Sequence, residues 1–130
     1  MASNVEALRE RYERFGQGDI EGALDMWTDD FVWDGAESEL PGAGRHEGKR
    51  AAVAVLQQAV GAWDSFELTA DEFFEDGDTV IVLGHTDVTK GDQSARLPVV
   101  HIWRTRGEGE VCRLQILTDT LATARALGVV

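Results

Sequence analysis

Residues 97–105 read LPVVHIWRT, a run of apolar strand-forming residues interrupted by a single histidine. Successive side chains of a strand point to opposite faces, so Val99, His101 and Trp103 share one face. The intervening apolar residues share the other face, and the run therefore predicts a strand buried on both sides. A buried imidazole needs hydrogen-bond partners or a chemical role, because an unpaired polar group is costly in an apolar setting.

Similar strand patterns surround this run and are separated by Gly-rich turns. The turns are DGD, KGDQ and GEGE, and each joins two neighbouring runs in the manner of a hairpin. The pattern thus predicts successive antiparallel strands at 66–75, 79–90, 94–106 and 111–118, followed by a short helical turn in ATARALG.

Helical patterns fill the first half of the chain. Ser3 and Glu6 have capping-box spacing, and an apolar stripe follows them up to Gly16 and Gly18. Asp19 can cap a second helix. The apolar faces of these two helices consist of Val5, Leu8, Tyr12 and Phe15, and of Ile20, Ala23, Leu24 and Trp27. A short strand at 31–34, a Gly-rich loop at 37–49 and a third helix at 49–63 complete this half.

Helices followed by a meander of strands indicate an α+β fold. We predict one domain spanning residues 1–130, in which a curved antiparallel sheet wraps around the N-terminal helices like a cone. The open end of such a cone is a pocket for a small apolar molecule.

Composition narrows the set of partners. The chain has 24 acidic and 12 Lys or Arg residues, a formal net charge of −12, which disfavours nucleic acid and anionic membrane surfaces. No apolar stretch approaches a membrane span and the N-terminus lacks a signal-peptide pattern, so we expect a cytoplasmic protein. Cys112 is the only cysteine and is expected to be a small buried hydrophobe. The three histidines show no metal-ligand spacing, so we expect no metal and no cofactor.

The element order resembles the nuclear transport factor 2-like superfamily, and within it the SnoaL-like polyketide cyclases and the ketosteroid isomerases. The resemblance covers nearly the whole chain. Its most specific stretches are GDIEGALDMWTDDFVWDG, LPVVHIWRT and DTLATARALG. It supports the cone-shaped fold, which carries many unrelated activities.

The resemblance implies roles for two residues. Asp34 matches the position of the general base in the steroid isomerases, and His101 matches the position of their oxyanion-stabilising acid. Base plus neutral acid in an apolar site is the pattern that ketosteroid isomerase exemplifies. A histidine can also donate the required hydrogen bond. We therefore expect Asp34 and His101 to be catalytic, with simpler roles in a turn and in a structural hydrogen bond as the alternatives.

Other family positions differ in this chain. The tyrosine of the isomerases falls on Arg11, one place from Tyr12, and the late-strand acid of the cyclases falls on Ile116. The Arg-x-Asp of the epoxide hydrolases is here His85-Thr86-Asp87, a pair on one strand face with either a structural or a proton-carrying role. We expect the substrate-binding residues to be Tyr12, Phe15, Trp33, Trp63, His85, Asp87, Trp103 and Ile116.

Three further positions have simpler expected roles. Asp119 precedes the last helical turn and is expected first as its N-cap. Arg45 and His46 lie in the Gly-rich loop, which would hang near the mouth of the cone.

The leading hypothesis is a cofactor-independent acid–base enzyme, an isomerase or a cyclase, acting on a small hydrophobic carbonyl compound. Two alternatives remain: a binding protein without turnover, and an epoxide-opening or dehydrating enzyme built on His85, Asp87 and Asp34. A homodimer is expected through the outer face of the sheet, where Val100 and Ile102 would lie.

Overall fold

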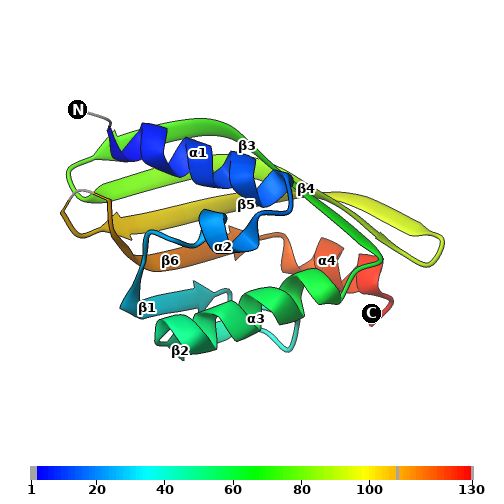
Figure 1. The fold of residues 1–130 in the computed structure, drawn as a ribbon. Coiled ribbons are helices and arrows are strands. Elements are labelled where there is room, and N and C mark those ends of the chain that lie inside the picture. Colours follow the sequence, from blue (N-terminus) through cyan, green and yellow to red (C-terminus); the bar gives the residue numbers. More distant parts are fainter. Residues whose placement is uncertain (1–2, 108, 130) are drawn as a thin grey trace.

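A computed structural model describes residues 3–107 and 109–129 of the chain. It confirms the predicted α+β class, with the main helices ahead of the long strands (Figure 1). The elements in chain order are α1 (Asn4–Gly16), α2 (Ile20–Ala23), β1 (Trp27–Gly35), β2 (Gly44–Glu47), α3 (Lys49–Gly61), β3 (Ser65–Asp76), β4 (Thr79–Lys90), β5 (Gln93–Thr105), β6 (Val111–Thr118) and α4 (Thr120–Leu127).

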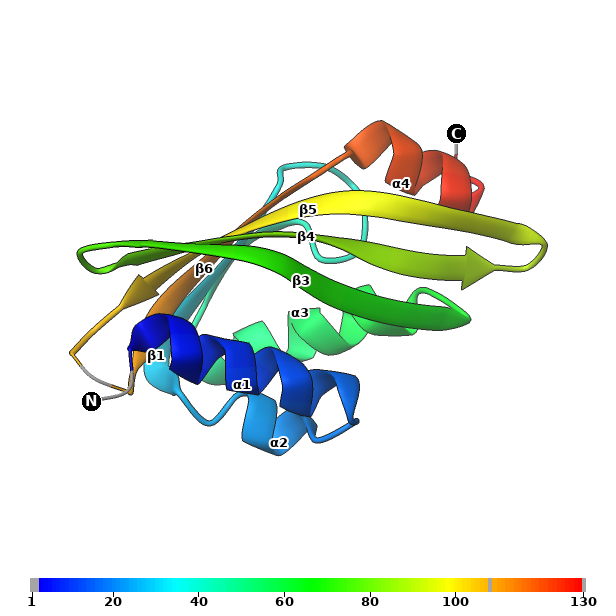
Figure 2. The same cartoon turned by 90° about the horizontal axis from the view of Figure 1, so that it is seen from above.

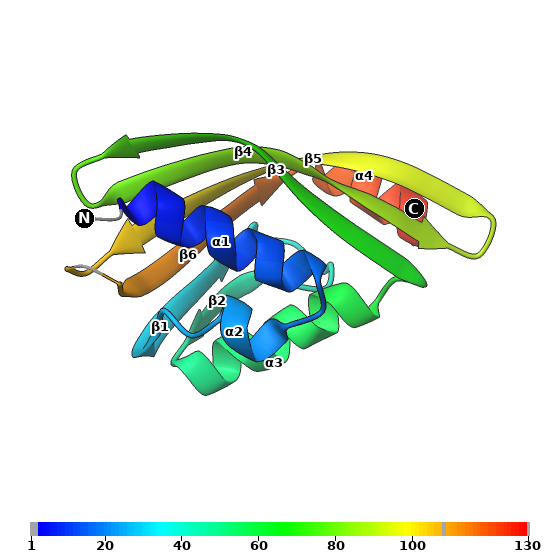
Figure 3. The same cartoon turned by 45° about the horizontal axis from the view of Figure 1, so that its top comes forward.

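The six strands form one curved sheet in the order β2-β1-β6-β5-β4-β3. Helices α1, α2 and α3 lie together on one side of it (Figures 2 and 3). The three predicted hairpins β3–β4, β4–β5 and β5–β6 are present and antiparallel. The β1–β6 pair is parallel, so the expectation of a wholly antiparallel sheet is wrong at this one place. The chain reaches β6 only after β2, α3 and three further strands, a connection long enough to bring it back in the same direction.

Local capping explains where the helices begin. The Ser3 hydroxyl oxygen accepts the Glu6 N–H at 3.1 Å, as the capping box predicts. Asp19 caps α2 and Asp119 caps α4, each by accepting the N–H three residues later at 2.9 Å, so the predicted capping role of Asp119 is confirmed. No helix among the described residues is long and apolar enough to cross a membrane.

The region from 19 to 49 differs most from the predicted elements. Helix α2 is a single turn, and Trp27 begins β1, where it pairs with Val111 and stacks on Phe31 at a ring distance of 4.0 Å. Packing within the sheet thus places Trp27 in a strand, although its spacing from Ala23 and Leu24 is typical of a helix. The predicted Gly-rich loop contains β2, an edge strand whose Gly-Arg-His-Glu sequence lacks the apolar alternation that identifies strands.

Strand β5 is buried on one face only, which corrects the expectation of burial on both. Leu97, Val99, His101 and Trp103 point toward the helices and are buried. Val100 and Ile102 point outward and are partly exposed. Helices α1, α2 and α3 lie on the concave side of the sheet (Figure 3), whereas α4 packs against β5 and β4.

Candidate active site

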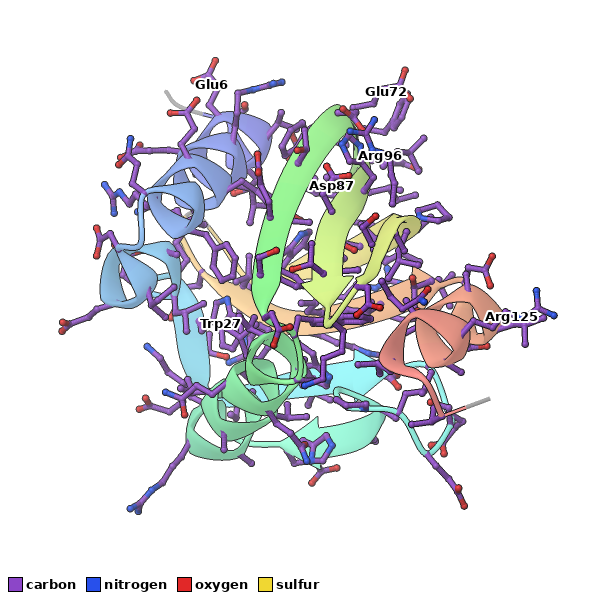
Figure 4. All side chains as sticks on the ribbon, turned by 90° about the vertical axis from the view of Figure 1, so that its right-hand side faces the viewer. Glu6, Trp27, Glu72, Asp87, Arg96 and Arg125 are labelled. Atoms are coloured by element: carbon purple, nitrogen blue, oxygen red, sulfur yellow. The ribbon has the colours of Figure 1, made fainter. Side chains whose placement is uncertain are left out.

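A cavity of about 190 Å³ lies between the concave face of the sheet and the helices. Its walls are mainly aromatic and aliphatic. Figure 4 shows the molecule from the end where α1 and α3 finish, and Trp27 lies in its interior. The lining includes the following predicted substrate-binding residues: Tyr12, Phe15, Trp33, Trp63, Trp103 and Ile116. His101 lines the same cavity.

His101 belongs to a short chain of hydrogen bonds that joins helix α1 to strand β5. The Trp103 indole N–H donates to the Tyr12 hydroxyl oxygen at 2.9 Å, and that oxygen lies 2.6 Å from His101 Nδ1. The Tyr12 and His101 rings are nearly parallel, with centroids 5.8 Å apart. Tyr12 is held edge-on to Trp103 and Phe73 as well, so its hydroxyl has a fixed place at the cavity wall.

Burial keeps both ionisable members of this chain neutral. Desolvation lowers the pKa of His101 to about 4. Desolvation also raises the pKa of Tyr12 far above its ordinary value, while the hydrogen bond from Trp103 opposes that change to a smaller extent. A neutral imidazole and a neutral phenol can share one proton in either direction, because each group can both donate and accept.

The second imidazole nitrogen, Nε2, has no protein partner among the described residues. The sealed side-chain atoms that lack partners in this part of the chain are Thr28 Oγ1 and Arg113 Nε, so His101 Nε2 is not cut off from the cavity. When Tyr12 donates to Nδ1, Nε2 carries the proton and is a donor to a bound molecule. When Nδ1 donates to Tyr12, Nε2 has a free lone pair and can act as a base.

Asp34 does not join His101 in the cavity, which corrects the expected convergence. Its neighbours Trp33 and Gly35 line the cavity, whereas Asp34 lies on the opposite face of β1 and forms an ion pair with Arg113. The alternation of the strand is the cause. Phe31 and Trp33 are drawn into the core, and Asp34 therefore points away from it.

His85 and Asp87 share one face of β4 as predicted, but that face also points away from the cavity. His85 Nδ1 lies 2.8 Å from Asp71, and Asp87 binds Arg96 at 2.9 Å, a hydrogen bond that lowers the pKa of Asp87. Neither residue is among the cavity-lining side chains, so the structure does not bring them together with the other predicted substrate-binding residues. An epoxide-opening site built on these two residues loses its geometric basis.

The intervening residue, Thr86, lines the cavity instead and was missed at the sequence level. The alternation of side chains along β4 indicated this position, because Thr86 lies on the same face as the buried Val82 and Val88. Arg11 and Ser38 also line the cavity without having been predicted to do so.

The segment before β2 forms part of the cavity wall. Ser38, Leu40, Pro41 and Ala43 line the cavity, and the Trp33 indole N–H holds the segment by donating to the Gly42 carbonyl oxygen at 2.8 Å. The expectation of a loop at the mouth is thus partly confirmed. Arg45 and His46 are instead part of β2 and do not line the cavity.

Cys112 is partly exposed on β6, and its thiol lies 3.7 Å from the Arg104 carbonyl oxygen. Cys112 is therefore less buried than the expected small buried hydrophobe.

We expect Tyr12→Phe to lower the free energy of unfolding by about 1–3 kcal/mol, because it leaves the buried Trp103 N–H and His101 Nδ1 without a partner. Urea denaturation measures the change. Trp103→Phe is the partner variant in a double-mutant cycle. Strict additivity of the two losses would show that the Tyr12–Trp103 hydrogen bond contributes nothing.

The chain matches the model of the SnoaL-like domain over residues 8–114. Among solved structures, an NTF2-like protein of unknown function from Burkholderia pseudomallei K96243 is 30% identical over 98% of both chains, with a TM-score of 0.87. TerC, co-crystallized with polyporic acid, is 30% identical over 96% of this chain and 98% of its own, with a TM-score of 0.84.

IdmH from Streptomyces antibioticus, described as a proposed polyketide cyclase, shares the fold at 17% identity over 98% of this chain and 100% of its own, with a TM-score of 0.78. Curated protein sequences gave no significant match. The match over most of the chain and the NTF2-like relative at 30% identity establish the family: this protein belongs to the SnoaL-like domain family of the NTF2-like superfamily.

Proposed function

We propose that this protein is a cofactor-independent enzyme that moves a proton between carbon and oxygen of a small hydrophobic carbonyl compound. The observation that carries the proposal is the neutral Trp103–Tyr12–His101 chain at the wall of an aromatic cavity. His101 and Tyr12 replace the predicted pair of Asp34 and His101 as the reacting groups.

The reaction needs no ionised side chain. His101 Nε2 removes the proton next to the substrate carbonyl, while Nδ1 gives its proton to Tyr12 and the Tyr12 O–H protonates the carbonyl oxygen. The ketone becomes an enol, Tyr12 recovers its proton, and His101 changes from its Nδ1–H to its Nε2–H tautomer. The reverse sequence returns the enol to a ketone. Avoiding charge suits this site, because desolvation opposes both imidazolium and phenolate.

A binding protein without turnover is the second candidate, and one observation favours it. The described residues that line the cavity include no Asp or Glu. The site therefore lacks the carboxylate base that the resemblance to the steroid isomerases implies. In this case His101 would only hold the ligand by a hydrogen bond.

Deuterium incorporation into β-tetralone, followed by NMR in heavy water near neutral pH, separates the two candidates. An engineered cavity of about 150 Å³ holds a benzene-sized molecule, so a bicyclic ketone is a suitable probe for this one. We expect the wild-type protein to accelerate exchange above the buffer rate with saturation. β-Naphthol, a stable mimic of the enol, should inhibit it more strongly than naphthalene does.

Binding of β-naphthol without any acceleration of exchange would overturn the proposed enzymatic activity and favour a binding protein without turnover. If neither compound binds, both candidates are overturned, because both place a small aromatic molecule in this cavity.

We also propose that the outer face of the sheet binds a second copy of the chain. Ile81 pairs with Ile102, and Leu83 with Val100, which itself pairs with Leu117. These apolar side chains form two adjacent rows across three strands, and Ile81 and Leu117 are 36% and 45% exposed. An apolar patch of this kind marks an interaction surface.

We expect light scattering after size-exclusion chromatography to give twice the mass of one chain. Ile102→Glu should give a monomer, because it puts a charge at the centre of the apolar rows. Ile20→Glu is the matched control, since Ile20 is 38% exposed on α2 and lies outside the patch. A monomeric wild type would overturn the proposal.

A further inference from the structure

The cavity is closed at one end and open at the other. Leu8 and Val111, which are 2% and 0% exposed, close the inner end. The opposite end is formed by residues that are exposed or partly exposed, and we call it the mouth: Ser38, Trp63, Phe66, Thr118 and Thr120. Three of the mouth residues, Ser38, Thr118 and Thr120, carry hydroxyl groups.

Thr86 lies between His101 and this mouth, on the same concave face of the sheet. His101 pairs with Val82, and Thr86 is four residues further along β4 toward the open end. With about 3.3 Å per residue along a strand and about 4.8 Å between strands, the Cα atoms of His101 and Thr86 are roughly 14 Å apart. The two side chains therefore face the cavity at well-separated points.

The Thr86 hydroxyl has no protein partner among the described residues, although the residue is only 5% exposed. It is not one of the sealed unpaired atoms in this part of the chain, so its free surface is the cavity. Two of the other lining hydroxyls already donate: Thr118 to the Pro98 carbonyl oxygen at 2.9 Å, and Thr123 to the Asp119 carbonyl oxygen at 2.7 Å. Thr86 is thus a buried donor and acceptor available to a bound molecule.

The charges around the cavity indicate an uncharged ligand. Arg11 is the one charged side chain among the described lining residues, and Asp25 occupies its guanidinium through two hydrogen bonds of 2.9 and 3.2 Å. Carboxylates flank the mouth, since Glu37 and Glu39 adjoin Ser38, and Asp119 lies between Thr118 and Thr120. Anionic groups are therefore repelled where a ligand enters.

We infer that Thr86 is a second anchoring point of the cavity, selecting an elongated, uncharged aromatic molecule that carries an oxygen near each end. One oxygen is bound by His101 and Tyr12, and the other by the Thr86 hydroxyl. The inference rests on the proposed function for the first of these contacts. Allowing for side-chain reach and a hydrogen bond at each end, the two ligand oxygens are roughly 10 Å apart.

Binding of a biphenyl series tests this anchor, measured by isothermal titration or by quenching of tryptophan fluorescence. The probes are para-phenylphenol, with one hydroxyl, and para,para′-biphenol, with a hydroxyl at each end. We expect the second hydroxyl to strengthen binding about fivefold, which is typical of one neutral hydrogen bond. A biphenyl with one hydroxyl and one carboxylate should bind more weakly than para,para′-biphenol.

Variants assign the effect to Thr86. Thr86→Val should abolish the advantage of the second hydroxyl, and Thr86→Ser should restore it, because serine keeps the hydroxyl group. Thr69→Val is the matched control, since Thr69 pairs with His85 on β4 and does not line the cavity. Melting curves of each variant verify folding.

An unchanged advantage in Thr86→Val, or an equal loss in Thr69→Val, would overturn the second anchor. Stronger binding of the carboxylate probe would overturn the preference for an uncharged ligand. Failure of the proposed function gives a different result: exchange into β-tetralone would then stay at the buffer rate, whatever Thr86→Val does to the affinity for para,para′-biphenol.

Discussion

His101→Phe is expected to reduce deuterium exchange into β-tetralone by about 10²–10⁴-fold, the range typical of losing a general acid–base group. Phenylalanine fills a similar space beside Val82 and Ile116, the pairing partners of His101, but has no nitrogen to accept or return a proton. The loss should appear in kcat more than in KM, because the aromatic wall that binds the probe is retained.

Asp34→Asn is the control for this variant, because Asp34 was the other residue expected to act as a base. Its side chain lies on the outer face of β1 with Arg113, so exchange should continue at the wild-type rate. If Asp34→Asn abolished exchange while His101→Phe did not, the proposed pair of reacting groups would be wrong. Circular dichroism of both variants excludes unfolding as the cause.

The positions of the long strands and of the main helices could be predicted from the sequence, because these depend on local periodicity and on turns. Strands β4 and β6 have the predicted bounds, and the Asp119 cap is where its spacing puts it. Strand β2 could not be predicted. Its four polar residues become a strand only by pairing with β1 at the edge of the sheet.

The direction of Asp34 was predictable from the sequence but was misjudged. Phe31 and Trp33 alternate with Asp34, so burying the two aromatic side chains places the carboxylate on the other face. The resemblance to the isomerases favoured a base at this position, and the prediction followed it rather than the alternation of the strand. The same alternation would have placed Thr86 inside and its two neighbours outside.

The hydrogen bond between Tyr12 and His101 could not be predicted, because it joins residues 89 positions apart. Helical spacing puts Tyr12 on the buried face of α1, and strand parity puts His101 on the buried face of β5. Which of the buried side chains meet depends on how α1 packs across the sheet, a property of the whole fold.

Acidification is expected to destabilise the folded protein between about pH 6.5 and pH 4. In the unfolded chain His101 has an ordinary pKa near 6.5, whereas burial lowers the pKa to about 4 in the folded state. Below pH 6.5 the unfolded state therefore binds the extra proton and is favoured. The folded state loses about 3 kcal/mol by pH 4, and below that pH the loss stops growing because both states are protonated.

The pH range of this loss of stability distinguishes the effect of His101 from that of the carboxylates. Asp25 has a lowered pKa in the folded state because of its hydrogen bond to Arg11, so its contribution is lost only as the pH falls below the ordinary carboxylate range near 3.8. Urea denaturation at pH 7, 5.5 and 4.5 should show the decrease in wild type. His101→Phe should lose less stability across these pH values, because it has no imidazole to protonate in the unfolded chain. An equal decrease in both proteins would mean that His101 is protonated as readily in the folded state as in the unfolded state, and the neutral proton relay would then have no basis.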